Sequence, residues 1–188
     1  MVFSITLIFL FGFTVSRWGS SRMDGNLRSL FLERAIMIAD SLDPGRISSL
    51  SGSVDDLGKD RYNVLKRHLQ SARSLYRDVR FLYILELKPD GRVVFLVDSE
   101  PEGSPDESLP GDLLDKPTPP LLNAFLTGKG NIEGPLEDSW GRWISANVPL
   151  HDTTTGRIFL LGMDINTDLW TASVRRTNKP YQAFSTLL

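Results

Sequence analysis

Apolar residues recur at helical spacing in the first part of the chain and predict two amphipathic helices. The first covers residues 22–42 and the second residues 55–77, with a Ser- and Gly-rich linker at 48–53 between them. The Asp-Pro-Gly sequence at 43–45 would end the first helix, because proline and glycine interrupt a helix. Both helices precede every predicted strand.

Two stretches rich in aromatic and β-branched residues predict β-hairpins. The first joins residues 81–87 to 92–98 through Lys-Pro-Asp-Gly, in which proline restricts φ and glycine accepts a positive φ. The second joins residues 142–150 to 157–165. The last of these strands is apolar on both faces, so we expect it at the centre of the sheet.

The remaining segments predict covering helices and loops. Residues 99–120 contain six prolines and are expected to form a surface flap. A short helix is expected at 121–126, a Gly-rich loop at 128–134 and a last helix at 167–176. This order of elements predicts an α+β fold, an antiparallel sheet with helices packed on its outside.

Length and composition indicate one globular domain. A chain of 188 residues with 41% hydrophobic residues can bury a substantial core. The net charge of -2 gives no reason to expect a nucleic-acid partner. There is no cysteine, which excludes disulfides, thiolate metal sites and a cysteine nucleophile.

Both ends of the chain have features of membrane segments. Residues 1–15 carry no charge and would form a helix of about 22 Å, shorter than the roughly 30 Å hydrocarbon core of a bilayer. With Arg17 and Trp18 as interfacial residues, we interpret residues 1–18 as a truncated transmembrane helix or signal anchor. A cleaved signal peptide and a buried core helix are the alternatives.

The other end of the chain follows a basic cluster and becomes apolar in its last residues. We interpret residues 177–188 as a juxtamembrane segment and the start of a second transmembrane helix. An ordinary chain terminus is the alternative.

Catalytic and metal-binding motifs are missing from the sequence. The GxSxG, HExxH and P-loop patterns do not occur, so the chain is not predicted to be an enzyme and no cofactor is expected. His68 and His151 stand alone and are interpreted as solvated or packing residues. An acidic series from Asp98 matches the start of a calcium loop, but Leu109 stands where its bidentate glutamate belongs. No metal site is therefore predicted.

Basic side chains gather along the second predicted helix and just after it. They are Lys59, Arg61, Lys66, Arg67, Arg73, Arg77 and Arg80. We interpret them as a solvated or dimer-facing surface, with a nucleic-acid patch as the alternative.

A small pocket is predicted where the second hairpin begins. Alternation along residues 143–150 puts aliphatic side chains on one face of the strand, and Trp143, Ser145 and Asn147 on the other. Asp164 follows on the next strand. An aromatic wall with a few polar groups is typical of a small-molecule site. The alternative is that Trp143 packs under the flap and Asp164 caps the last helix.

Two segments carry a resemblance to a known family. LYILELKPDGRVVFLVDSEPEGSPD and WGRWISANVPLHDTTTGRIFLLGMDI resemble the PAS-like extracytoplasmic Cache (PDC) sensor domains of bacterial and archaeal receptors, such as sensor histidine kinases and diguanylate cyclases. The resemblance covers about residues 22–176. It implies a central antiparallel sheet of about five strands with a long N-terminal helix and flanking helices.

The resemblance also implies roles for individual residues. In amino-acid-binding members of the family, an arginine and aromatic residues at the start of this strand hold the ligand carboxylate, and an aspartate after the last strand holds its amine. Arg142, Trp143 and Asp164 match these positions, whereas Ile144 replaces the second aromatic residue. The expected ligand-binding residues are Tyr83, Phe95, Arg142, Trp143, Ser145, Asn147 and Asp164.

We therefore expect residues 22–176 to form a sensory domain that binds a small-molecule ligand outside the cytoplasm. Its signal would cross the membrane to a cytoplasmic output domain, a histidine kinase or a diguanylate cyclase. A homodimer through the N-terminal helix is expected, and a nucleic-acid partner is not. The alternative is a ligand-free structural or dimerisation module of a membrane protein.

Overall fold

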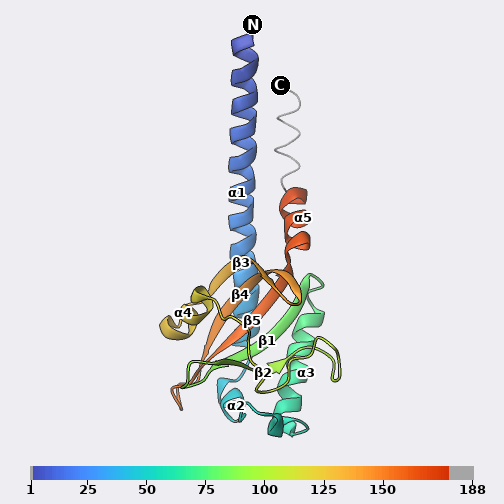
Figure 1. The fold of residues 1–188 in the computed structure, drawn as a ribbon, viewed down its shortest axis with the longest axis vertical. Helices are drawn as coiled ribbons and strands as arrows, with labels where there is room; N and C mark the ends of the chain where they lie inside the picture. The colour runs from blue at the N-terminus through green and yellow to red at the C-terminus, as the bar shows by residue number, and fades with distance from the viewer. Residues whose placement is uncertain (1, 178–188) are drawn as a thin grey trace. The chain divides into compact units, whose positions relative to one another are not determined.

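A five-stranded antiparallel sheet forms the centre of the larger of two compact units (Figure 1). The computed structural model describes residues 2–177, and the side chains of residues 21–176. The larger unit comprises Leu32–Thr167. The smaller unit contains the chain up to Phe31 together with the last helix from Asp168 on.

The order of the strands confirms that the last strand lies at the centre of the sheet. The strands are β1 (Val79–Leu87), β2 (Val93–Asp98), β3 (Asn131–Asp138), β4 (Gly141–His151) and β5 (Ile158–Asn166). They lie in the order β2-β1-β5-β4-β3, and each neighbouring pair is antiparallel. All of β5 except its two end residues is buried, because both of its faces are covered.

Helices complete the α+β fold that the sequence predicts. They are α1 (Val2–Asp40), α2 (Pro44–Ser48), α3 (Asp60–Ser74), α4 (Pro119–Thr127) and α5 (Thr167–Thr177), with a short 3-10 turn, η1, at Val54–Asp56. Helix α4 packs its apolar side on the sheet face that carries Leu85, Phe95 and Leu160. Helix α3 contacts β1 and β2.

Several segments differ from the sequence prediction, among them α2 and η1, which were not predicted. Helix α3 begins at Asp60 instead of residue 55, because the buried carboxylate of Asp56 accepts hydrogen bonds from the backbone N–H groups of Ser51 and Gly52 and stabilises a turn. The segment predicted as a Gly-rich loop instead supplies β3, at the edge of the sheet. A register shift between Glu133 and Leu136 accommodates its proline, which an edge strand tolerates.

Two basic side chains of α3 pair with carboxylates at the end of β2 and on the flap, which in the structure covers residues 99–118. The Lys66 side chain is only 9% exposed, and its ammonium lies 2.8 Å from Asp98 and 2.7 Å from Glu107. Arg73 pairs with Glu100 at 2.8 Å, and further ion pairs join β1 to the same loop. The prediction of a solvated or dimer-facing surface is therefore wrong for Lys66 and Arg73.

In the smaller unit, Trp170 connects α5 to α1. Its indole N–H donates a hydrogen bond to Asp24 at 2.7 Å, and its ring packs edge-to-face on Phe31 with ring centres 5.7 Å apart. Within residues 2–177, no helix meets the length and hydropathy needed to cross a membrane. The second membrane segment, predicted at 177–188, lies outside the described residues apart from Thr177.

Replacing Lys66 by alanine should strongly destabilise the protein. The substitution leaves the carboxylates of Asp98 and Glu107 buried without their shared cation, which typically costs about 3–5 kcal/mol. Lys129→Ala is the matched control, because Lys129 is exposed. Urea unfolding at pH 7 measures both variants, and equal losses for the two would contradict the role of Lys66.

Candidate ligand-binding site

Three neighbouring strands place polar side chains in one row on the sheet. Glu133 of β3 lies opposite Ser145 of β4, and Ser145 lies opposite Asp164 of β5. Directly opposite residues point to the same face of a sheet, so these three side chains share one surface. Asn147, two residues after Ser145, points to the same side and is fully buried.

The absence of a side chain at Gly162 makes room for Tyr83. The two residues are partners across β1 and β5, and a Cβ atom on Gly162 would lie 2.1 Å from a ring carbon of Tyr83. The Tyr83 ring therefore lies over the central strand, where its hydroxyl is 3.4 Å from a carboxylate oxygen of Asp164. Phe95 packs edge-to-face on the ring of Tyr83, with centres 5.3 Å apart.

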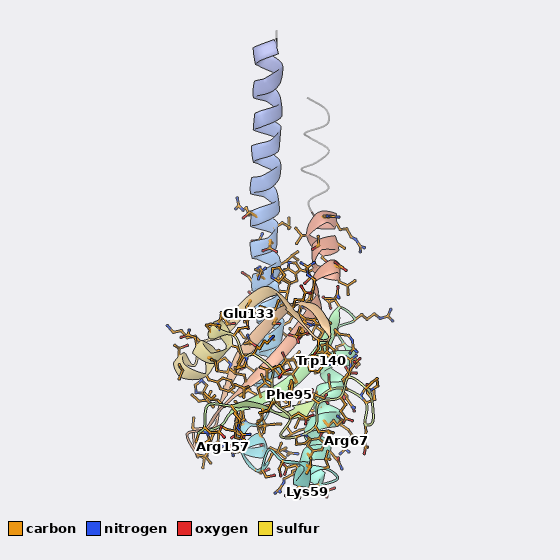
Figure 2. The ribbon with its side chains drawn as sticks, in the orientation of Figure 1. Lys59, Arg67, Phe95, Glu133, Trp140 and Arg157 are labelled. Atoms are coloured by element: carbon orange, nitrogen blue, oxygen red, sulfur yellow. The ribbon has the colours of Figure 1, made fainter. Side chains whose placement is uncertain are left out.

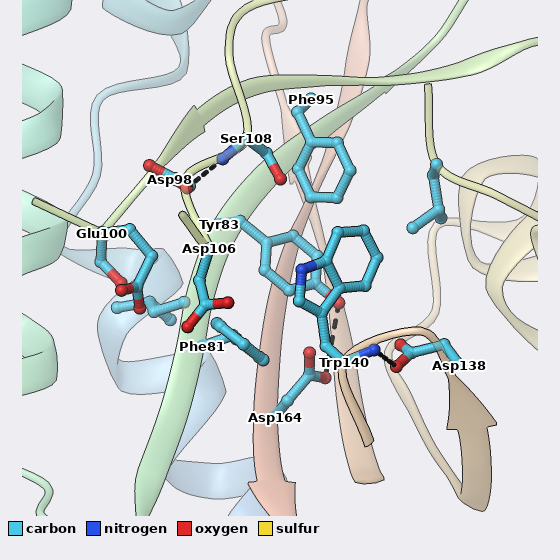
Figure 3. A pocket seen from close by; sticks show the side chains of 13 residues that line it. Phe81, Tyr83, Phe95, Asp98, Glu100, Asp106, Ser108, Asp138, Trp140 and Asp164 are labelled. Atoms are coloured by element: carbon cyan, nitrogen blue, oxygen red, sulfur yellow. Dashed lines mark hydrogen bonds between the residues drawn. The ribbon is translucent and has the colours of Figure 1, made fainter. Parts of the chain in front are cut away.

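The turn between β3 and β4 presents two tryptophans to this surface. One carboxylate oxygen of Asp138 accepts hydrogen bonds from the backbone N–H of Trp140 at 2.8 Å and from the indole N–H of Trp143 at 2.9 Å. Trp143 is buried and packs edge-to-face on Phe81. Figure 3 shows the ring of Trp140, which is 43% exposed, among Tyr83, Phe95 and Asp164.

Two adjoining cavities lie between this sheet face and the flap. The larger has a volume of about 420 Å³ and is bounded by β3, β4 and residues 114–118 of the flap. The smaller, of about 50 Å³, lies beneath the part of the flap that includes Asp106 and Ser108. The residues common to both are Tyr83, Leu114, Asp138, Trp140 and Asp164. The larger volume is in the range of small-molecule sites, about 300–1,000 Å³.

The electrostatic character of the site is acidic. Burial raises the pKa of Asp164 to about 7; hydrogen bonds from Ser145 and Tyr83 oppose this shift, and the charges of Asp138 and Glu133 add to it. Burial and the neighbouring Asp164 also raise the pKa of Tyr83. Within the described residues, none of these three carboxylates forms an ion pair with an arginine or lysine of the chain.

Six of the seven predicted ligand-binding residues come together at these cavities. They are Tyr83, Phe95, Trp143, Ser145, Asn147 and Asp164. Arg142 is the exception, because the alternation of β4 turns it to the other face, where it is exposed opposite Glu137. Arg142 therefore lies away from these cavities. Ligand binding by all seven residues stays a prediction.

Trp140, Asp138 and Glu133 are among the lining residues that sequence reasoning missed. Trp140 and Asp138 belong to a tight turn whose conformation directs the tryptophan ring, and Glu133 belongs to the segment predicted as a loop. Strand β4 needs a neighbouring strand on its second edge, and this requirement could have identified the segment that contains Glu133. Figure 2 shows Glu133, Trp140 and Phe95, which come from different segments of the chain and line these cavities.

Comparison with known proteins identifies the fold. No family model and no curated protein matches the sequence. The ligand-binding domain of the Campylobacter jejuni chemoreceptor Tlp3 in complex with L-valine aligns with a TM-score of 0.54 at 16% identity, over 86% of this chain and 60% of that chain. The same domain with L-norvaline gives 0.56 at 17% identity, over 93% and 64%. The chain has the fold of these receptor domains.

A third similar structure is an extracellular ligand binding receptor from Desulfohalobium retbaense. It aligns with a TM-score of 0.57 at 11% identity, over 82% of this chain and 26% of that chain. The chain thus spans less than two thirds of the length of each of these proteins. At such identities the similarity concerns the fold, and it agrees with the predicted PAS-like sensor architecture.

The buried Asp164 should make the stability of the ligand-free protein depend on pH. Because its pKa is raised from 3.8 to about 7, the folded state holds a proton that the unfolded state releases in this interval. The stabilisation is complete below the unfolded pKa and is lost as the pH rises through the folded pKa. The free energy of unfolding of the wild type relative to Asp164→Asn should fall by about 1.4 kcal/mol per pH unit over this interval.

Urea unfolding of both proteins at several pH values measures this difference, since titrating groups that do not interact with Asp164 cancel in the comparison. A difference that does not change with pH would contradict the raised pKa of Asp164.

Proposed function

We propose that this chain is an extracytoplasmic sensory domain that binds a small molecule in the cavities beneath the flap. The observation that carries the proposal is Asp164, a carboxylate that is only 6% exposed, faces a cavity and forms no ion pair within the described residues. A buried charge without a partner is costly, so a site of this kind is suited to a ligand that supplies the missing charge.

The walls of the cavities favour a positively charged group on the ligand. Tyr83 and Trp140 present aromatic rings next to Asp164, and the face of an aromatic ring attracts a cation. An ammonium group there would pair with the carboxylate and contact the rings. In the absence of ligand, the raised pKa lets Asp164 accept a proton instead.

The proposed signal runs along β5 to the end of the domain. Asp164 lies three residues before α5, and α5 contacts α1 through Trp170. Occupancy of the site would favour one arrangement of these helices over another. Residues 1–18 and 177–188 would enter the membrane, and a cytoplasmic histidine kinase or diguanylate cyclase would receive the signal. The receptor would act as a homodimer through the N-terminal helix.

A ligand-free dimerisation module is the second candidate. The observation that favours it is an exposed apolar groove between α1 and α3, where Met37 is 66% and Leu75 76% exposed. Ligand binding distinguishes the two candidates, because a structural module needs no ligand at the sheet.

Asp164→Asn should weaken ligand binding without loss of the folded state. Isothermal titration with a panel of primary amines and amino acids would identify a binder, and the substitution should then reduce affinity about ten- to a hundredfold, as for a lost charge-assisted hydrogen bond. The exposed Asp40→Asn is the control. If no compound binds, or if Asp164→Asn binds as the wild type does, the ligand-free module is the better description.

A reporter inserted in the turn after Gly91 should show that the domain lies outside the cytoplasm. This turn joins β1 to β2 and is exposed, so an insertion there leaves the sheet intact. In the full-length protein, alkaline phosphatase at this position should be active and green fluorescent protein should be dark. The reverse pattern would place the domain in the cytoplasm.

A further inference from the structure

The edge of the larger cavity away from β5 contains a second buried carboxylate, Glu133. One of its oxygens accepts a hydrogen bond from the Thr118 hydroxyl at 2.6 Å, and the other accepts one from the side-chain amide of Asn147 at 2.8 Å. Glu133 is 8% exposed, and no ion pair to it is found within the described residues. Neutral donors therefore satisfy part of its hydrogen-bonding capacity and leave its charge without a partner.

Asn147 adds a buried acceptor to this part of the cavity. Its Nδ2 donates to Glu133 and, at 3.2 Å, to the amide oxygen of Asn131. Because both acceptors are oxygens, the amide nitrogen of Asn147 faces them and its Oδ1 points away. Its Oδ1 is buried without a hydrogen-bond partner among the described residues, and the residue lines the larger cavity. A buried acceptor of this kind is normally satisfied, so the site is complete when a ligand brings a donor.

The Glu133 position is separate from Asp164 and belongs to the same cavity. The two residues lie at the ends of the row through Ser145, two strand spacings or about 10 Å apart at their Cα atoms. Their charges still influence one another, since Glu133 contributes to the raised pKa of Asp164. One cationic group near Asp164 would leave the charge of Glu133 without a partner.

We infer that Glu133 and Asn147 form a second cation-binding position, so that the ligand is a linear molecule with two positively charged ends, such as a short diamine. The inference rests on the proposed function and specifies the ligand of that site. One ammonium group pairs with Asp164 among the aromatic rings, and the other pairs with Glu133 and donates to Oδ1 of Asn147. The separation fits a chain of about three to five carbons between the two nitrogens.

A zwitterionic amino acid fits this cavity less well. Its carboxylate would face Glu133, while Arg142 points to the other side of the sheet. Lys116 is the basic side chain at the cavity, but it is exposed on the flap. A carboxylate held by Lys116 is the competing arrangement, and it predicts that an amine with a distal carboxylate binds best.

Isothermal titration of the whole chain with four compounds tests the inference at about 0.15 M salt, where weak surface attraction is screened. The compounds are 1,4-diaminobutane, 1,5-diaminopentane, butylamine and 4-aminobutyrate. The diamines should bind with one site per chain and about ten- to a hundredfold more tightly than butylamine, because the second ammonium gains a charge-assisted contact. This comparison uses the wild type alone and needs no variant to fold.

Glu133→Gln then locates the second position. This substitution keeps the shape of the side chain and removes its charge, so the preference for diamines over butylamine should disappear. Glu102→Gln, at an exposed position of the flap, should keep the preference.

If butylamine or 4-aminobutyrate binds as tightly as the diamines, the inference of a ligand with two positively charged ends is wrong. The proposed sensory function is not contradicted by that result. A preference for diamines that survives Glu133→Gln would overturn the assigned position. If no amine and no amino acid binds the wild type, both the inference and the proposed function are wrong.

Discussion

Antiparallel pairing of β5 with both β1 and β4 is the interaction on which the site depends. The register of these two ladders brings Gly162 beneath the ring of Tyr83 and aligns Asp164 with Ser145. A shift of one residue in either ladder would turn a whole set of side chains to the opposite face. The apolar side chains on both faces of β5 make such a shift unfavourable, so burial of the central strand also fixes the geometry of the cavity.

The flap closes the cavity because acidic residues on it meet basic residues of α3 and β1. Lys66, Arg73 and Arg80 neutralise carboxylates that would otherwise repel one another beside an acidic site. The loop contains many prolines and little regular structure. These ion pairs therefore stabilise its conformation where the backbone hydrogen bonds of a helix or strand are missing. The lysine is the most deeply buried of the three basic side chains, which makes its pair more sensitive to removal of one partner than a surface pair.

Carboxylates on the flap and carboxylates on the sheet thus have different partners, although they lie close together. Glu100, Asp106 and Glu107 of the flap are paired with basic side chains of the chain itself. Within the described residues, Asp164 and Glu133 on the sheet have only neutral hydrogen-bond donors. The first set holds the loop, and the second keeps an unbalanced charge inside the protein. An unbalanced buried charge is unfavourable for stability and is common at functional sites, which is why the binding proposal rests on the sheet residues.

The sequence by itself determined the fold class, both hairpins, the central strand and six of the side chains on the cavity surface. These follow from local periodicity, because alternation along residues 143–150 already separates Trp143, Ser145 and Asn147 from the aliphatic face. Tertiary structure alone decided the edge strand β3, whose proline and glycine hide its alternation, and with it the placement of Glu133. It also decided that Lys66 is buried, because the partner of a long charged side chain is set by contacts between segments far apart in the chain.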